Sequence, residues 1–192
     1  KTASLDRINE DFHYGLRPGN FCFGILKLDG HVFDDMENLR FMADKVRGVM
    51  DRLLPECTFD YELLVAGSFF YFLLNFEESM RSQVRRQMKA LFDEIRIQGG
   101  ILKDFAATLS LGTVCGGLDG LDSSLKNARL LIEERLVAGT GKLLEGELPQ
   151  KGSFADSTLF AEFNSRMSQA LESLDVLSVR EALQQLKSQM LA

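Results

Sequence analysis

The sequence predicts an α+β domain that is built on a central, mainly antiparallel sheet with helices packed against it and is followed by a helical linker. Three observations predict this fold class. Strand and helix signals alternate up to residue 147, one strand segment is apolar at nearly every position, and the chain beyond residue 148 is helical in character. We expect a domain at 1–148 and a helical linker at 149–192, joined near Pro149 and Gly152.

The first strand is predicted at residues 21–28, because the run FCFGILKL follows a turn signal at 17–20 and is apolar almost throughout. Such a run is typical of a strand covered on both faces. A helix is predicted next and should end at Pro55. Its apolar residues recur at steps of three and four: Met36, Leu39, Ala43, Val46, Met50 and Leu53.

A hairpin of two strands is predicted over residues 61–76, with Gly67 at its turn. Residues 77–97 read as a helix, and the alternating segment 106–114 reads as a half-buried strand. A further helix begins at Leu121, and a short apolar strand, KLLEG, comes last. The predicted order is therefore β-α-β-β-α-β-α-β. The residues predicted to share one side of that further helix are Leu125, Ala128, Ile132 and Leu136.

The C-terminal region carries apolar residues at helical spacing and a capping-box spacing at 178–181. Either these helices pack onto the domain or they form a homodimer, and the heptad-like run is too short to decide. The residues that we predict at such an interface are Phe160, Phe163, Met167 and Leu174.

The net charge of −6 argues against DNA binding by this segment, since a DNA-binding surface needs clustered Lys and Arg. No apolar run is long enough to span a bilayer, and the first residues lack the features of a signal peptide, so we expect a cytoplasmic protein without membrane contact. Because the chain starts at Lys1 rather than Met, we expect it to belong to a longer protein. The three cysteines predict neither a metal site nor disulfides.

Two stretches, FGILKLDGHVFDDM and ATLSLGTVCGGLDGLDSSLKNARLLIEERLVAGTGKLLEGE, follow each other in an order and spacing that agree with the predicted elements. Together with the leading segment INEDFHYGLRPGNF, they resemble the GGDEF family, and more narrowly the degenerate GGDEF-like domains of bacterial AraC-type response regulators. The second stretch is similar to the family's S-x-G strand and the helix after it. The helical tail also looks like the segment that precedes the helix-turn-helix pair of that subgroup.

The resemblance implies a nucleotide cyclase fold whose catalytic residues are replaced. The first-strand carboxylate that binds metal in active members falls on Lys27, the family's following lysine falls on Val32, and Asp29 keeps the second acidic position. The signature hairpin falls on Ala66, Gly67, Ser68, Phe69 and Phe70, where Ser68 and Phe69 replace the acidic pair. A hydroxyl is a poor ligand for a hard cation and a phenyl ring is none.

Two further family sites are also altered. The guanine-contacting pair falls on Asp35 and Met36, and the inhibitory product site falls on residues 57–60, where Asp60 remains and the arginine is lost. We therefore expect no enzyme activity, no metal site and no cofactor.

Two hypotheses on function remain. In the first, the domain is a non-catalytic relay of a two-component, AraC-type transcriptional regulator and reaches DNA only through another domain. In the second, the half-site at Lys27, Asp29 and Ser68 holds a nucleotide or another anionic small molecule. The basic stripe of Arg81, Arg85 and Lys89 is better explained as a salt-paired helix face.

Overall fold

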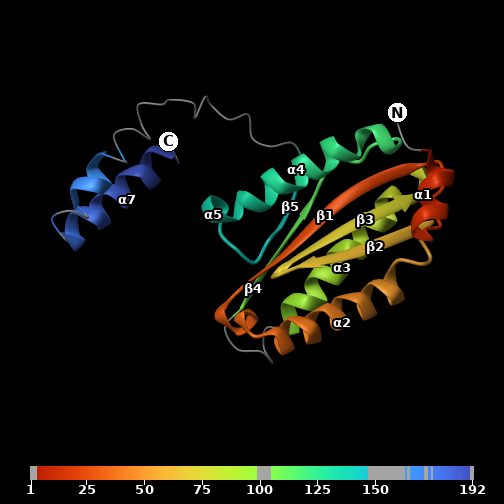
Figure 1. The fold of residues 1–192 in the computed structure, drawn as a ribbon, viewed down its shortest axis with the longest axis horizontal. Coiled ribbons are helices and arrows are strands. Elements are labelled where there is room, and N and C mark those ends of the chain that lie inside the picture. Colours follow the sequence, from red (N-terminus) through yellow and green to blue (C-terminus); the bar gives the residue numbers. More distant parts are fainter. Residues whose placement is uncertain are drawn as a thin grey trace. The chain divides into compact units, whose positions relative to one another are not determined.

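The computed structural model describes residues 4–98, 105–146, 163, 165–170, 173 and 175–190. The chain divides into two compact units, residues 1–148 and residues 149–192. Figure 1 shows the first unit as a sheet with helices packed against it, and each unit is described by itself below.

From β1 to β5, the first unit contains strands and helices in the predicted order, and the unpredicted helix α1 precedes them. In chain order they are α1 (Leu5–Phe12), β1 (Asn20–Asp29), η1 (His31–Asp34), α2 (Met36–Leu53), β2 (Asp60–Ala66), β3 (Phe69–Phe76), η2 (Glu78–Met80), α3 (Arg81–Gln98), β4 (Ala106–Leu111), η3 (Leu118–Gly120), α4 (Leu121–Glu133), α5 (Arg135–Ala138) and β5 (Leu143–Glu145). The β-α-β-β-α-β-α-β order predicted from the sequence is confirmed.

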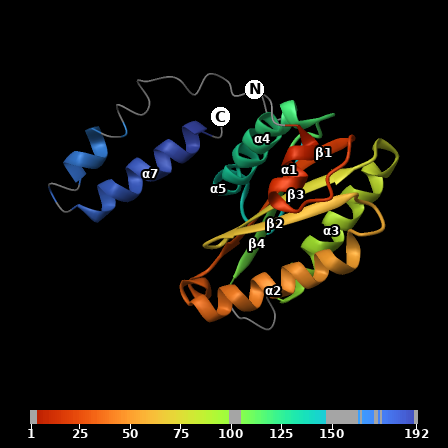
Figure 2. The ribbon, with the colours of Figure 1, turned by 45° about the vertical axis from the view of Figure 1, so that its right-hand side comes forward.

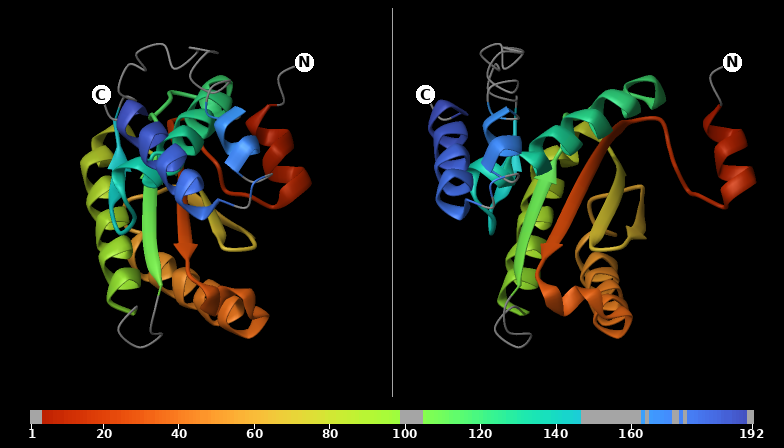
Figure 3. Two further views of the ribbon diagram at one scale, coloured as in Figure 1. Left: turned by 90° about the vertical axis from the view of Figure 1, so that its left-hand side faces the viewer. Right: turned by 60° about the vertical axis from the view of Figure 1, so that its left-hand side comes forward.

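The five strands form one sheet in the order β2-β3-β1-β4-β5. Neighbouring strands are antiparallel except β4 and β5, which are parallel. The apolar β1 lies at the centre, and β5 is a short edge strand beyond β4 (Figure 3). The predicted fold class, an α+β domain with a central, mainly antiparallel sheet flanked by helices, is confirmed.

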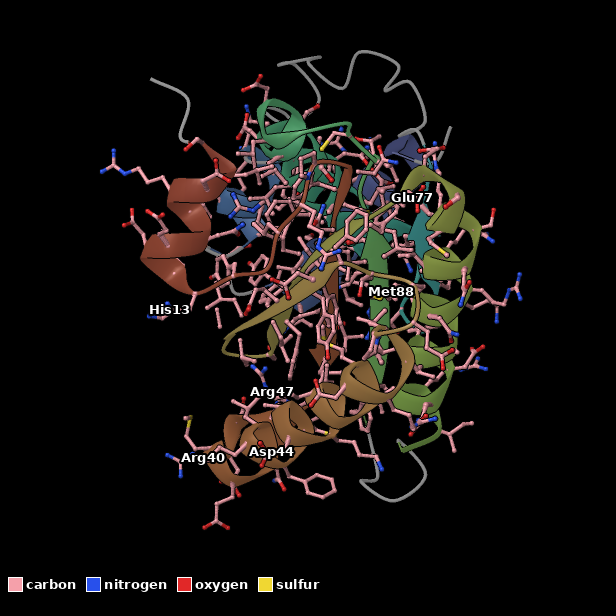
Figure 4. All side chains as sticks on the ribbon, turned by 90° about the vertical axis from the view of Figure 1, so that its right-hand side faces the viewer. His13, Arg40, Asp44, Arg47, Glu77 and Met88 are labelled. Carbon is pink, nitrogen blue, oxygen red and sulfur yellow. The ribbon has the colours of Figure 1, made fainter. Side chains whose placement is uncertain are left out.

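Helices cover both faces of the sheet, with α2 and α3 on one face and α4 on the other (Figure 2). The main core lies beneath α2 and α3 and includes Leu26, Phe72 and Met88, all fully buried. In Figure 4, Met88 points from α3 toward the sheet, whereas the exposed Arg40 projects away from it. A smaller cluster around Ile25 and Ala128 fills the space beneath α4. The central strand therefore needs apolar residues on both faces, as its sequence indicated.

Helix α2 follows the predicted boundaries, but its buried face differs from the prediction at the N-terminal end. Met36 is 63% exposed, and Met42 is fully buried instead. The reason is that Asp35 caps the helix by accepting a hydrogen bond from the Glu37 amide at 2.9 Å, so Met36 is the first helical residue and lies on the open side of that turn.

Strand β4 was predicted to be half-buried, and this was wrong. Thr108 and Ser110, which alternate with the apolar residues, are fully buried because α4 covers the second face of the strand. The Ser110 hydroxyl donates to the Ala128 carbonyl of α4 at 2.8 Å, which satisfies the buried group. The prediction for Leu136 was also wrong. This residue is 78% exposed because α4 ends at Glu133 and the chain turns before it.

Helix α1 was not predicted from the polar opening of the chain. Ser4 caps it by accepting from the Arg7 amide at 3.3 Å, and none of its residues is buried. Its weak apolar signal consists of Leu5, Ile8 and Phe12 at steps of three and four.

The second unit contains helical residues at 165–170 and the helix α7 (Val176–Met190). Ala170 and Ala182 are buried in this unit. Helix α7 begins earlier than the predicted capping box, because Asp175 accepts from the amides of Leu177 at 3.0 Å and Ser178 at 3.3 Å. In the part of the chain that the structure describes, no helix is long and apolar enough to cross a membrane.

Candidate functional site

Lys27 lies near the end of β1, opposite Phe69 of β3 and Thr108 of β4. Its ammonium group donates a hydrogen bond to the Ser68 hydroxyl, and its Nζ atom lies 4.5 Å from the centre of the Phe69 ring. The strand register thus brings the first-strand position and the hairpin turn together, as the resemblance implied.

The hairpin turn between β2 and β3 has two central residues, Gly67 and Ser68, with Ala66 paired to Phe69. Gly67 has a φ of 56°, a left-handed conformation that glycine adopts without steric cost and that two-residue hairpins require. The Ser68 carbonyl also accepts from the Leu28 amide at 3.0 Å, which ties the turn to β1. Gly67 is therefore suited to the geometry of the turn.

Two cations share one carboxylate at this site. Asp29 Oδ1 lies 3.8 Å from Lys27 Nζ, and Asp29 Oδ2 lies 3.2 Å from Arg135 Nε. The side chains of Lys27 and Arg135 are only 14% and 13% exposed. Arg135 also donates to the Ile132 carbonyl at 3.0 Å, at the end of α4. We call Lys27, Asp29, Ser68, Phe69 and Arg135 the Lys27 cluster.

Burial lowers the pKa of the Lys27 ammonium below its ordinary value, Asp29 opposes this effect, and the positive Arg135 lowers the pKa further. The cluster thus holds two positive groups and one negative group in a mostly shielded place. Such an arrangement repels a divalent cation, and the only carboxylate in it is engaged by Arg135.

The structure brings some predicted site residues together and separates others. Ser68 and Phe69 contact Lys27, but Phe70 is fully buried on the opposite face, in the core beneath α2 and α3. Ala66 is exposed at the end of β2. Arg135 was missed by the sequence reasoning, because nothing in the local pattern links it to Asp29, 106 residues earlier.

A small hollow of about 220 Å³ adjoins the Lys27 cluster beneath the end of α4. Its walls are Ile25, Phe69, Tyr71, Arg129, Ile132, Glu133 and Arg135. Phe69 and Tyr71 are stacked with ring centres 6.3 Å apart. Lys27 is not among the residues that line this hollow, and its ammonium group contacts Ser68 and Asp29.

The residues at the other two family sites have structural partners. Asp35 caps α2, and the side chain of Val32 lies outside the described part of the structure. Asp60 accepts a hydrogen bond from the Gly15 amide at 2.6 Å and from the Tyr61 amide at 2.9 Å, while Cys57 is buried. Asp60 therefore fastens the segment before β1 to the start of β2.

The S-x-G motif, which carries the most specific part of the resemblance, has a packing role. A Cβ at Gly112 would lie 2.2 Å from the Ser124 carbonyl oxygen of α4. Ser110 donates to α4, and the Ser124 hydroxyl accepts from the Phe23 amide of β1 at 2.9 Å. The motif therefore allows α4 to approach the sheet closely.

The basic stripe on α3 is salt-paired, as the sequence indicated. Arg85 forms a two-pronged ion pair with Glu145 of β5, and Lys89 Nζ lies 2.6 Å from Asp93. Arg81 pairs with Glu78 at 3.4 Å. The partner of Arg85 comes from another element and could not be read from helix spacing.

The predicted C-terminal interface is described in part. Phe163 and Met167 are half-buried within the second unit, whereas Phe160 and Leu174 lie outside the described residues. Helix α7 exposes Val176, Leu177 and Leu183, each at least half exposed.

No protein-family model matches the chain, and no curated protein sequence matches it significantly. Among solved structures, the active GGEEF domain of a diguanylate cyclase from Vibrio cholerae is similar over 74% of this chain and 89% of its own, with a TM-score of 0.47 and 10% identity. A microbial GGDEF domain in an interaction with bis-(3,5)-cyclic di-GMP matches 67% of this chain and 80% of its own, with a TM-score of 0.41 and 14% identity.

An EAL/GGDEF domain protein from M. capsulatus matches 77% of this chain and 100% of its own, with a TM-score of 0.42 and 15% identity. Similarity at this level carries no information about the activity of the present chain.

Proposed function

We propose that this chain is a GGDEF-like domain without cyclase activity that relays a signal in the bacterial cytoplasm. In this proposal it belongs to a two-component, AraC-type transcriptional regulator and acts through its C-terminal helices on a separate DNA-binding domain. The observation that carries the loss of activity is the Lys27 ammonium, held between Ser68, Asp29 and the Phe69 ring.

A cyclase of this family needs divalent cations to neutralise the phosphates of GTP. The residues present do not fit that requirement. Lys27 places a positive charge at the first-strand metal position, and Ser68 and Phe69 supply no carboxylate at the hairpin. Asp29 retains a carboxylate at the second acidic position, but this carboxylate pairs with Arg135 and Lys27.

The same contacts argue against the second hypothesis, a nucleotide or other anion bound by Lys27. An anion at that position would have to displace Asp29 or Ser68 from a cation that is 14% exposed. The internal partners of Lys27 therefore favour the relay over the binding site.

The proposed loss of cyclase activity is tested by incubating the full chain with GTP and either Mg²⁺ or Mn²⁺. Chromatography then detects any cyclic di-GMP, and an active diguanylate cyclase serves as the positive control. We expect no product. Formation of cyclic di-GMP by the unaltered chain would overturn the proposal.

A metal titration gives a second readout. Lys27→Asp removes the ammonium and adds a carboxylate beside Asp29, so we expect Mn²⁺ to raise its melting temperature. Lys27→Met, which only removes the charge, is the matched control. Equal stabilisation of the unaltered chain by Mn²⁺ would show that Lys27 does not exclude the metal.

The relay through the C-terminal helices depends on the exposed apolar residues of α7. If these residues form a homodimer, Leu183→Glu should convert it to a monomer in light scattering after size-exclusion chromatography, and Gln184→Glu should not. An unaltered chain that is monomeric at every concentration would remove dimerisation from the proposal.

A further inference from the structure

A second cavity, of about 460 Å³, opens between the N-terminal half of α3 and the ends of β4 and β5. Its lining includes Cys22, Arg81, Val84, Arg85, Leu111 and Glu145. Cys22 and Lys27 are five residues apart on β1, or about 17 Å along a strand, so this cavity is separate from the Lys27 cluster.

The cavity exists because the sheet is short at this edge. Strand β5 has only three residues and ends at Glu145, so the first turns of α3 extend past it without a strand beneath them. Val84 and Met88, on the inner side of α3, are among the residues that line the cavity, and Met88 points toward the sheet (Figure 4).

The walls of the cavity are apolar and firmly placed. Leu74, Phe76, Val84, Met88 and Leu111 all belong to the main core, and each is at most 8% exposed. The volume lies within the range of small-molecule sites, which are concave, mostly apolar and equipped with a few polar groups that orient the ligand.

The polar groups at the mouth are mainly cationic. Arg81 and Arg85 lie one helical turn apart on α3, and both line the cavity together with Glu145. Glu145 engages Arg85 from β5, whereas Arg81 has a single 3.4 Å contact to the exposed Glu78, which lies outside the lining. The lining therefore contains two arginines and one carboxylate, and Glu78 lies beside it as the partner of Arg81.

We propose that this cavity binds a small amphipathic carboxylate, with its apolar part against Val84, Leu111 and Val114 and its carboxylate at Arg81 and Arg85. A carboxylate is the group whose geometry fits a guanidinium with two hydrogen bonds. Glu145 occupies one guanidinium in the absence of ligand and competes with the ligand for it. The site gives the domain a means to sense a metabolite independently of the Lys27 cluster.

Calorimetry of the full chain with hexanoate, heptanoate and octanoate tests the apolar part. We expect saturable binding that strengthens about fourfold per added methylene, equivalent to about 0.8 kcal/mol for each buried methylene. The same series of alcohols should bind more weakly because it lacks the charge. Absence of saturable octanoate binding would overturn the proposal.

Variants that remove a charge at the mouth of the cavity should change octanoate affinity in opposite directions, depending on the sign of the charge removed. Arg81→Ala and Arg85→Ala should each weaken octanoate binding about tenfold, while Glu145→Gln should strengthen it several-fold because it frees Arg85. Arg86→Ala, on the same helix but outside the lining, is the control and should leave affinity unchanged. Equal affinities in all four variants would overturn the proposed role of the arginines.

A filling variant locates the site. Val114→Phe enlarges a half-buried side chain in the wall and should abolish binding of octanoate and octanol alike, with an unchanged circular dichroism spectrum. Unchanged octanoate affinity in this variant would place the binding elsewhere and refute the assignment. None of these outcomes depends on whether the chain makes cyclic di-GMP.

Discussion

Asp29 is the residue that connects the two cations of the Lys27 cluster, through contacts of 3.2 Å to Arg135 and 3.8 Å to Lys27. Loss of one partner of a shielded ion pair is more destabilising than loss of the pair, because an unpaired charge remains out of water. The three residues are therefore not equivalent for stability, although all three are charged.

We expect Asp29→Asn to lower the free energy of unfolding by about 2 kcal/mol, since it leaves two cations without a carboxylate. Lys27→Met should change it by less than about 1 kcal/mol, because Asp29 keeps Arg135 and the methionine chain fills the same space. Urea denaturation of both variants measures the difference. A larger loss for Lys27→Met than for Asp29→Asn would contradict the assigned geometry.

Tyr61 is a second residue with a measurable signature. Burial, a 2.9 Å hydrogen bond to Asp51 and the nearby negative charges raise the pKa of its hydroxyl to about 12. In the unfolded chain a tyrosine has a pKa near 10. The folded protein therefore keeps the proton where the unfolded chain loses it, and this stabilisation is fully present below pH 10 and is lost as the pH rises toward 12.

We expect the free energy of unfolding to fall between about pH 10 and 12, and Tyr61→Phe to reduce that slope. Denaturation at a series of alkaline pH values provides the measurement. An identical slope in the two proteins would show that Tyr61 does not titrate in this way.

At the scale of the elements, two glycines have opposite effects on stability, one packed against α4 and one within α2. Gly112, at the end of β4, lies against α4 with no room for a Cβ, whereas Gly48 lies in the middle of α2 with nothing within 4 Å of that position. The first glycine is required by close packing. The second only adds flexibility to the unfolded chain and weakens the helix.

Gly112→Ala should therefore destabilise the domain by about 2 kcal/mol or more, because the Ser124 backbone must move. Gly48→Ala should stabilise it by about 0.5–1 kcal/mol. The pair is compared by thermal unfolding, with opposite shifts in melting temperature expected. Shifts of the same sign would refute the packing role of Gly112.

The elements themselves follow from local sequence, but their exact ends do not. Residues 21–28 and 69–76 are apolar enough to predict buried strands, and Gly67 predicts the turn before the second of them. Helix α7, in contrast, starts at an Asp175 cap and not at the predicted box that begins with Ser178. Both residues have suitable capping chemistry, so sequence alone could not choose between them.

At the scale of the whole molecule, residues 1–148 contain the complete five-stranded sheet and the main core. The sequence predicts a domain boundary at residue 148. Independent folding of residues 1–148 remains a prediction. A chain that ends at residue 148 should unfold cooperatively at a melting temperature within about 3 °C of the longer chain. A non-cooperative transition in the short chain would show that the C-terminal unit is needed for the fold.

The sequence by itself determined the α+β class and the order of strands and helices from β1 to β5. These properties depend on residue type and on spacing within one element, which are visible in a linear pattern. Only the tertiary structure decided that Arg135 joins Asp29, that Asp60 holds Gly15, and that Arg85 and Glu145 share a cavity mouth. Those contacts join residues 45 to 106 positions apart, and their partners are set by how the sheet and helices pack.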